Sequence, residues 1–388
     1  MSWSISPVVD WMLHKGRHLA TPEALVGELC ARVRSAGMPI ERVGFFFGTL
    51  HPQYFGIAMF WEGEGDRVRV FEGSHQMGQS DEVRNSPARR ITEGERVIRR
   101  RLADPGCPMD FPILLDLRAA GVTDYVIAEV VFGNGSRNSV SLATRRPGGF
   151  TDHDIAEVQK LLHPFGMAME IYVGRALART LLDTYLGRIS GARVLDGQIR
   201  RGDGESLEAV IWFSDLRDST PLARALGERR FLELLNDYFE ATAGAVLLHG
   251  GEVLRFIGDA SLAVFPTAGD TAQAACLRAA AAARAARARA GEANERRRSA
   301  GLPPFAYGVG LHLGRVLYGN IGTPERLEFS VIGAAANEAA RIEALCKETA
   351  RDVVLSGAVA AALGEPCPSL GSFTLRGVAQ PMEIFALP

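Results

Sequence analysis

The 388-residue sequence lacks the cysteine pattern of a disulfide scaffold or a zinc site. Its five cysteines are scattered and odd in number, with no CxxC pair and no Cys/His spacing typical of a metal site. Such isolated thiols are typical of proteins that fold in a reducing compartment. We therefore expect a cytoplasmic protein with free cysteines.

Long apolar runs and a strong net charge are also missing. No apolar run approaches the roughly 18 residues of a membrane-spanning helix. The first twenty residues carry Asp10, Lys15 and Arg17 and lack the core and cleavage site of a secretory signal. The formal net charge is only -2, and the Ala/Arg-rich run 276–298 also contains acids, so we interpret that run as a solvated helix. The sequence thus predicts no membrane span and no nucleic-acid partner.

Residues 1–165 are predicted to form a regulatory domain that contains both helices and strands. The helix 21–37 begins with Thr21-Pro22, which suits a cap and first turn, and Asn134-Gly135 marks a hairpin between two apolar runs. This order resembles a GAF-type sensor domain, with one antiparallel sheet flanked by helices, over about residues 20–172. A PAS-like or another α+β domain is the alternative. The elements that carry the resemblance are helices 21–37 and 86–102, strands 42–50, 55–62, 67–72, 125–132 and 139–146, and a helix from Phe150 onward.

Residues 166–206 are predicted to link this regulatory domain, which would receive an unknown small ligand or signal, to a second domain. Val173, Leu177, Leu181 and Tyr185 recur at four-residue spacing and form an apolar stripe. The stripe predicts a short parallel helix pair between two protomers; the alternative is a helix that lies on one of its own domains. Glycines from Gly187 onward are expected to end the helix.

Two carboxylates in the second domain are predicted to end neighbouring strands. Asp215 follows the apolar strand 209–213, and Asp259 follows strand 252–257 at the tip of a predicted hairpin. Thr220-Pro221 begins a helix close to Asp215, and a helix N-terminus offers free N–H groups to phosphate. Two such carboxylates can share two Mg²⁺ ions, which bind triphosphate oxygens and lower the pKa of a ribose hydroxyl.

A third group of residues lies near the C-terminus. Asn337 and Arg341 are four residues apart on a predicted helix and face the same way. An arginine there can neutralise charge that develops on a transferring phosphorus and its leaving group, and an asparagine can hold a ribose.

Together these segments resemble the class III adenylate/guanylate cyclase family over residues 207–388. The resemblance implies an α+β fold with a ferredoxin-like core, and two copies that pair head to tail to form two shared sites. Residues 182–199 also resemble the transducer linker that precedes bacterial cyclase domains. The segments that carry the match, in the order of the family, are 213–217 (FSDLR), 256–259 (FIGD), 308–314 (GVGLHLG), 319–322 (GNIG), 331–333 (VIG), 337–343 (NEAARIE) and 375–377 (LRG).

The resemblance also implies roles for single residues. Asp215 and Asp259 would bind two Mg²⁺ (or Mn²⁺) ions, helped by the backbone carbonyl of Leu216. Asn337 and Arg341 would come from the partner protomer. Arg255 and Ser330, also from the partner protomer, would bind the base, and Arg376 would bind the terminal phosphates. Thr220 is added to the substrate-binding positions because it begins the helix that can face phosphate.

Two departures from the family pattern bear on function. Adenylate cyclases usually have Lys where Arg255 stands, while Ser330 is similar to the Thr of one bacterial subgroup, and the acid–Cys pair of guanylate cyclases is absent. Asp218-Ser219 replaces the usual Gly-Phe near the triphosphate. We therefore expect a homodimeric adenylate cyclase that converts ATP to 3′,5′-cyclic AMP under control of the N-terminal domain. The alternatives are a cyclase that uses GTP and a weak or silent nucleotide-binding sensor.

Overall fold

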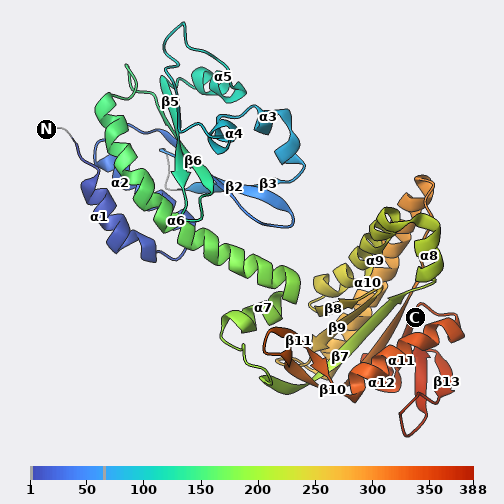
Figure 1. Cartoon of the computed structure of the whole chain (residues 1–388). Helices are drawn as coiled ribbons and strands as arrows, with labels where there is room; N and C mark the ends of the chain where they lie inside the picture. Colours follow the sequence, from blue (N-terminus) through green and yellow to red (C-terminus); the bar gives the residue numbers. More distant parts are fainter. Residues whose placement is uncertain (1–2, 64–66) are drawn as a thin grey trace. The chain divides into compact units, whose positions relative to one another are not determined.

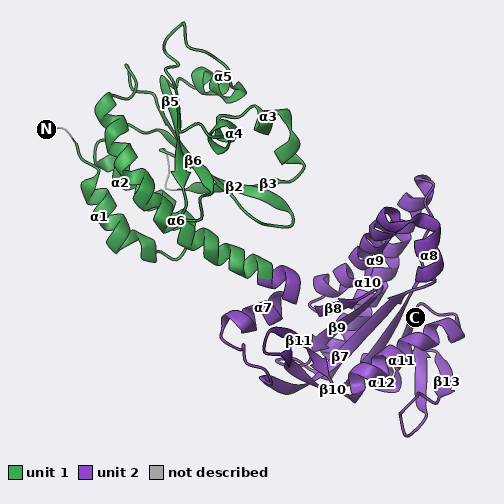
Figure 2. Ribbon diagram, in the orientation of Figure 1, with its two compact units in different colours: residues 1–181 green, residues 182–388 purple. Residues whose placement is uncertain are grey.

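The chain folds into two compact units. The computed structural model describes residues 3–63 and 67–388. Contacts divide the chain at residues 181 and 182, into the units Met1–Leu181 and Leu182–Pro388 (Figure 2). Each unit is a mixture of helices and an extended sheet. No helix in the described ranges is both long and apolar enough to cross a membrane.

The N-terminal unit is built on a six-stranded antiparallel sheet. Its strand order is β3-β2-β1-β6-β5-β4. The predicted hairpin is confirmed, because β5 and β6 pair antiparallel on either side of the loop 132–136, where Gly135 has a φ of +81°. The strands are β1 (Arg42–Gly48), β2 (Tyr54–Glu62), β3 (Val68–Ser74), β4 (Val97–Arg100), β5 (Asp124–Val131) and β6 (Arg137–Thr144).

The two faces of this sheet are covered differently (Figure 1). One face packs on α1 (Ser6–His14), α2 (Pro22–Ser35) and α6 (Asp152–Leu186), and together they bury the larger core of the unit. Short elements lie over the other face. They are the 3₁₀ turn η2 (Met77–Gln79), α3 (Asp81–Arg84), α4 (Pro87–Thr92) and α5 (Pro112–Ala119), with a further 3₁₀ turn, η1 (Gly16–His18), between α1 and α2.

The helix predicted over residues 86–102 is wrong in its second half. Ser86 caps α4 as its composition suggests, but the helix ends at Thr92. Gly94 then takes a φ of +126°, which a helix cannot continue. Residues 97–100 instead form β4 and pair with β5, because a β-branched apolar pair there completes the edge of the sheet.

The helix α6 runs without a break for 35 residues. Its first turn is closed by a reciprocal cap: the Thr151 N–H donates to Asp154 Oδ2 at 2.8 Å, and the Asp154 N–H donates to Thr151 Oγ1 at 3.1 Å. Up to Tyr172 one side of the helix is buried in its own unit, whereas Leu181 and Tyr185 are 39% and 78% exposed. The later part of the predicted apolar stripe is thus open to solvent, and its pairing between protomers stays a prediction.

The C-terminal unit contains an eight-stranded sheet with the order β13-β14-β12-β10-β7-β9-β8, and β11 pairs with β10 off this path. The long strand β7 is central and antiparallel to both β9 and β10. The bounds are β7 (Gly204–Leu216), β8 (Glu252–Ile257), β9 (Ala260–Pro266), β10 (Tyr307–Thr323), β11 (Arg326–Ile332), β12 (Val353–Ser356), β13 (Ser369–Phe373) and β14 (Met382–Ala386).

Helices cover both faces of the sheet near β7. Val210 and Trp212 of β7 lie in the core formed with α9 and α10, while Ala209 and Ile211 lie in the core that includes α11, as the alternation of a strand requires. The helices are α7 (Arg188–Leu195), α8 (Ser219–Leu226), α9 (Glu228–Leu248), α10 (Ala272–Ser299), α11 (Ala334–Thr349) and α12 (Gly357–Leu363).

Three expectations for this unit need correction. The helix expected from Thr220 is two helices, because Gly227 has a φ of +73° and separates α8 from α9. The glycine-rich segment after α6 still forms one short helix, α7. The solvated Ala/Arg helix is α10, but its alanine side is fully buried in the core, since small side chains let it pack closely on α9.

Candidate active site

Asp215 and Asp259 lie side by side at one end of the sheet. Asp215 is the penultimate residue of β7 and pairs with Ala260, the first residue of β9. Asp259 precedes Ala260 in the two-residue turn between β8 and β9, in which Gly258 takes the φ of +65° that such a turn needs. The Leu216 N–H donates to the Asp259 carbonyl at 3.2 Å. The backbone thus holds Asp215, Leu216 and Asp259 together.

The two carboxylates repel each other. Burial raises the pKa of Asp215 above its usual range, and the charge of Asp259 raises it further, although Arg217 opposes both effects. The Oδ1 atom of Asp215 is buried and has no hydrogen-bond partner among the described residues. A buried oxygen in this state carries a cost that a cation can remove.

The donor set suits a hard divalent cation. It consists of carboxylate oxygens, with the backbone carbonyl of Leu216 adjoining them, and Mg²⁺ prefers oxygen ligands while keeping sites for phosphate and water. No cluster of three or more His, Cys, Asp or Glu side chains suited to a metal exists within residues 3–63 and 67–388. Asp215 and Asp259 would therefore hold cations together with a bound phosphate rather than as a complete protein cage.

A second buried acid lies beneath this pair. Glu343 of α11 is 3% exposed and forms an ion pair with Arg217 at 2.9 Å. Burial raises the pKa of Glu343 to about 7; Arg217 opposes the change and the charge of Asp215 adds to it. Three ionisable groups from β7, the segment after it and α11 are thus packed against one another.

Glycines of β10 make this packing possible. A Cβ atom at Gly308 would lie 2.1 Å from a guanidinium nitrogen of Arg217 and 2.2 Å from Glu343 Oε1. A Cβ atom at Gly310 would lie 2.5 Å from the Glu343 backbone nitrogen and 2.6 Å from the Ala339 carbonyl oxygen. The alternating glycines of the 308–314 motif therefore let α11 rest directly on the strand.

The segment after β7 departs from an ordinary turn. Asp218 has a φ of +53°, in the left-handed region, and α8 begins at the next residue. Among the residues that the structure describes, no side chain caps the first N–H groups of α8. Thr220 is exposed in the first turn of α8. This end of the helix can receive an anion, with the Asp218 carboxylate close to it in sequence.

Arg255 and Ser330 lie beside a residue that sequence reasoning missed. The Nη1 atom of Arg255 in β8 donates to both carboxylate oxygens of Glu328, at 3.2 and 3.1 Å. Glu328 and Ser330 are two residues apart on β11 and so share one face. Ser330 is 1% exposed, and its hydroxyl has no partner among the described residues. The period-two spacing of Glu328 and Ser330 was the signal that could have identified the acid.

Asn337 and Arg341 lie away from the carboxylate pair. Both lie on the α11 side opposite Glu343, with Asn337 exposed and Arg341 partly exposed. The Arg341 guanidinium lies near Gly377, next to the exposed Arg376. Within the described ranges, no hydrogen bond or ion pair joins Asn337 or Arg341 to Asp215 or Asp259. One chain thus presents two separate halves of the predicted site.

A buried carboxylate also fastens α7 to the sheet. Glu252 at the start of β8 is 2% exposed. Its Oε1 accepts hydrogen bonds from the Ser190 N–H at 2.7 Å and from the Ser190 hydroxyl at 2.8 Å, and its Oε2 accepts one from the Tyr318 hydroxyl at 2.5 Å. The segment that follows α6 is therefore attached to the strand that carries Arg255 and leads to Asp259.

Known proteins share a domain that is similar to this unit. Residues 204–387 match the family model described as the adenylate and guanylate cyclase catalytic domain. Adenylate cyclase 1 of Rhizobium meliloti is 31% identical over 175 residues, which are 45% of this chain and 25% of that protein. An adenylate cyclase of Anabaena cylindrica is 31% identical over 190 residues, 48% of this chain and 36% of that protein. The chain therefore spans only a quarter to about a third of these curated relatives.

Among solved structures, the guanylyl cyclase Cya2 is 30% identical and aligns with a TM-score of 0.42, over 47% of this chain and 92% of that one. The matched residues include Asp215 and Asp259, the strand β10 with its glycines, and Asn337 and Arg341 of α11. The C-terminal part of this chain, residues 204–387, thus matches the family of adenylate and guanylate cyclase catalytic domains.

Proposed function

We propose that this protein is an adenylate cyclase that converts ATP to 3′,5′-cyclic AMP and pyrophosphate. The observation that carries the proposal is the pair Asp215 and Asp259, with a buried Asp215 oxygen that has no hydrogen-bond partner among the residues that the structure describes. Two Mg²⁺ or Mn²⁺ ions bound there would lower the pKa of the ribose 3′-hydroxyl and neutralise the triphosphate. In the reaction the 3′-oxygen bonds to the α-phosphorus, the bond from that phosphorus to the bridging oxygen breaks, and pyrophosphate leaves while the hydroxyl proton passes to solvent.

The other residues of the site bind and orient the substrate. The uncapped N–H groups at the start of α8, near Thr220, would receive phosphate oxygens. Arg341 would stabilise the charge that builds on the α-phosphoryl and pyrophosphate groups, Asn337 would hold the ribose and Arg376 would bind the terminal phosphates. Arg341 and Arg376 are suited to this, because neither has a carboxylate within ion-pair distance in the part of the chain that the structure describes.

The proposed site is shared between two copies of the chain. Asn337 and Arg341 face outward on α11 and do not contact the carboxylate pair of their own chain. A head-to-tail homodimer would bring them to the carboxylates of the partner. The exposed stripe of α6, which includes Leu181 and Tyr185, would add a second contact between the protomers.

ATP is the proposed substrate. Glu328 holds Arg255 in place, so that its remaining N–H groups can donate to a ring nitrogen, and the buried Ser330 hydroxyl can accept from an adenine amino group. The two curated relatives described above are named adenylate cyclases. GTP is the second candidate, because the guanidinium of Arg255 can also donate to a guanine oxygen.

The N-terminal unit is proposed to act as a GAF-like sensor that regulates the cyclase. Support comes from its antiparallel sheet with helices on one face, and from the continuous helix α6 that leaves it. A signal would act by favouring one arrangement of the two protomers over another.

The test is product analysis combined with subunit mixing. Purified protein with ATP and Mg²⁺ or Mn²⁺ should yield 3′,5′-cyclic AMP and pyrophosphate, and GTP should yield much less product. Asp215→Ala and Arg341→Ala should each be inactive, and their mixture should regain activity because a mixed dimer has one intact site. Absence of any cyclic nucleotide would overturn the enzyme proposal. If the two variants exchange subunits and the mixture remains inactive, the shared site is wrong, while the enzyme proposal still stands.

A further inference from the structure

The face of the N-terminal sheet that α1, α2 and α6 leave free contains a large cavity. Its volume is about 830 Å³, and its lining comes from β1, β2, β3, β5 and β6 and from the short elements η2 to α5 that lie over them. Pockets that enclose small organic ligands measure roughly 300–1,000 Å³. Protein interiors are normally packed without such spaces, so a hollow of this size in one unit calls for an occupant.

Aromatic side chains form one wall of the cavity. Phe60 makes edge-to-face contacts with Phe46 and with Phe71, both with ring centroids 5.6 Å apart. Phe71 and Phe55, at the edge of the cavity, are 52% and 38% exposed. Large apolar side chains left in contact with water cost free energy in proportion to their area, and a flat apolar ligand would remove that cost.

Polar groups gather at one place in the cavity. Arg42 of β1 and Tyr125 of β5 pair with the same residue of β6, Ala143, from opposite sides. Ser139 and Ser141 follow on the same face of β6, because residues two apart in a strand share a face. The sheet therefore places one guanidinium and three hydroxyl groups on the face of the sheet that forms the cavity floor.

These polar groups have unused bonding capacity. Ser139 is 1% exposed and its hydroxyl has no partner among the described residues. The hydroxyl of Ser141 reaches the Gly44 carbonyl only at 3.4 Å. Arg42 stacks over Phe60 with its Cζ 5.1 Å from the ring centroid, and its nearest carboxylate contact, to the half-exposed Glu62, is 3.9 Å long. A surface ion pair of that length contributes little, so the guanidinium is available to an anion.

We propose that this cavity binds a planar aromatic molecule that carries one acidic group. The rings of the ligand would lie against the aromatic wall, and its acidic group would accept hydrogen bonds from Arg42 and the hydroxyls on the cavity floor. The two other arginines of the lining, Arg89 and Arg137, already pair with Glu93 and Glu129 at 2.7 and 3.0 Å. Arg42 is thus the cationic group left for a ligand, and the lining also contains the acids Glu72, Glu82 and Asp116. These acids would repel a highly charged anion, so the arrangement suits a single carboxylate or sulfonate beside Arg42 better than the phosphate and ribose of a nucleotide.

The test uses two probes of the same shape on the full-length protein. The anionic probe is 8-anilinonaphthalene-1-sulfonate and the neutral probe is N-phenyl-1-naphthylamine, both followed by fluorescence titration. We expect saturable binding of both at one site per chain. Arg42→Met keeps the apolar stem over Phe60 but removes the charge, so it should weaken the anionic probe about tenfold or more and change the neutral probe less than twofold.

Two further variants separate the cavity from general surface binding. Ser139→Leu should fill the cavity and abolish binding of both probes, and Phe71→Ser, on the half-exposed edge, should weaken both without disturbing the core. The matched control is Leu248→Ser, which removes a 69% exposed leucine of the other unit and should change nothing. Thermal melting establishes that each variant is folded.

Two results would overturn the proposal. If Ser139→Leu and Phe71→Ser leave both titrations unchanged, the probes do not bind in this cavity. If 3′,5′-cyclic AMP or GMP displaces the anionic probe at lower concentration than simple aromatic acids such as naphthoate, the cavity is a nucleotide site. The outcome is independent of cyclase activity, since no step of the test measures turnover.

Discussion

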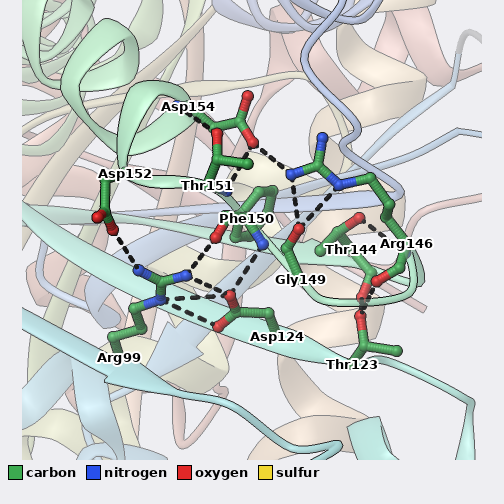
Figure 3. Close-up of polar contacts among 10 residues, drawn as sticks. All are labelled: Arg99, Thr123, Asp124, Thr144, Arg146, Gly149, Phe150, Thr151, Asp152 and Asp154. Carbon is green, nitrogen blue, oxygen red and sulfur yellow. Dashed lines mark hydrogen bonds and ion pairs between the residues drawn. The ribbon is translucent and has the colours of Figure 1, made fainter.

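The carboxylates of the candidate site differ from the buried carboxylates of the N-terminal unit in how their charge is compensated. In the N-terminal unit, Asp124 and Asp154 are almost completely buried and fully bonded (Figure 3). Asp124 accepts hydrogen bonds from Arg99 at 2.7 Å and from the Phe150 N–H at 3.0 Å. In the C-terminal unit, Asp215 has a buried oxygen without a partner in the described part of the chain, and Glu343 forms an ion pair with Arg217.

The pKa values of these acids shift in opposite directions for this reason. Burial alone would raise the pKa of Asp154, but hydrogen bonds from Thr151, Trp3 and Arg146 outweigh it and hold the pKa below its usual range. The pKa values of Asp215 and Glu343 are raised, because burial there is not compensated. Asp124 and Asp154 fix the start of α6, and Glu252 of the second unit is bonded as fully as they are. Asp215 and Glu343 instead stay in a costly state that a cation and a substrate can relieve.

The largest expected effect comes from removing the charge at the unsatisfied acid. Asp215→Asn should reduce turnover at least about 10³-fold, since the lost transition-state stabilisation amounts to several kcal/mol. In metal-free buffer the same variant should melt at a higher temperature than the wild type, because it removes repulsion with Asp259. Cyclic nucleotide assays test the loss of turnover, and calorimetry in EDTA tests the rise in melting temperature. A variant that is inactive and also less stable would contradict the comparison.

The second prediction makes the same change at a fully bonded acid, Asp124→Asn in the N-terminal unit. It removes the close, buried carboxylate partner of Arg99 and leaves the more distant, exposed Asp152 at 3.8 Å. Breaking a buried pair of this kind costs roughly 3–5 kcal/mol. We expect a lower melting temperature for the N-terminal unit and an unchanged one for the C-terminal unit. Hydrogen exchange of β5 and of the α6 first turn, compared with that of β7, measures this directly. Equal protection in wild type and variant would refute it.

The next effect concerns the glycine on which α11 rests. Gly310→Ala places a Cβ atom within 2.6 Å of backbone atoms of α11, so the helix must shift, at a cost of about 1–3 kcal/mol. Gly174→Ala in α6 is the matched control, because its Cβ would meet nothing within 4 Å and alanine favours a helix. Denaturant titration should show a loss for the first and a small gain for the second. Similar values would show that α11 is not in close contact with β10.

The two units should also respond oppositely to pH. A raised pKa means that the folded C-terminal unit holds its protons more tightly, so its stability falls as the pH rises from about 4.5 to 7, the window of Glu343. A lowered pKa at Asp154 means that the N-terminal unit loses stability as the pH falls below about 4. Melting curves in EDTA across this range test the signs. Glu343→Gln should reduce the pH dependence of the stability of the C-terminal unit and leave that of the N-terminal unit unchanged.

The smallest effect is expected at Asp218. A non-glycine residue at a φ of +53° carries a modest strain, and its charge lies beside the α8 start. Asp218→Gly should raise stability by up to about 1 kcal/mol and lower the KM for ATP, while Asp218→Asn should lower the KM alone, since asparagine tolerates the same backbone. Steady-state kinetics of the pair separate charge from strain. An unchanged KM in both would place the carboxylate away from the substrate.

Much of the site arrangement followed from the sequence, because local rules determine it. A strand that ends in Ser214-Asp215 and a Gly258-Asp259 turn between two apolar runs place both acids at one end of a sheet. The break at Gly227 and the strand at residues 97–100 were missed, since a single glycine with positive φ overrides helical periodicity. The burial of Glu343 and the ion pair between Arg255 and Glu328 depend on packing between distant segments, which no local pattern records.

The hydrogen bonds of Glu252 with Ser190 and Tyr318, called the Glu252 clamp below, determine where a chimera of this protein can be joined. Because Glu252 belongs to the sheet and Ser190 to α7, the short helix is part of the catalytic unit's architecture rather than a free tether. A chimera that grafts another input domain upstream of Gly187 keeps the Glu252 clamp whole. One joined at residue 204 would leave a buried carboxylate facing a missing partner. The best junction for joining a different input domain to this protein therefore lies within the last turns of α6.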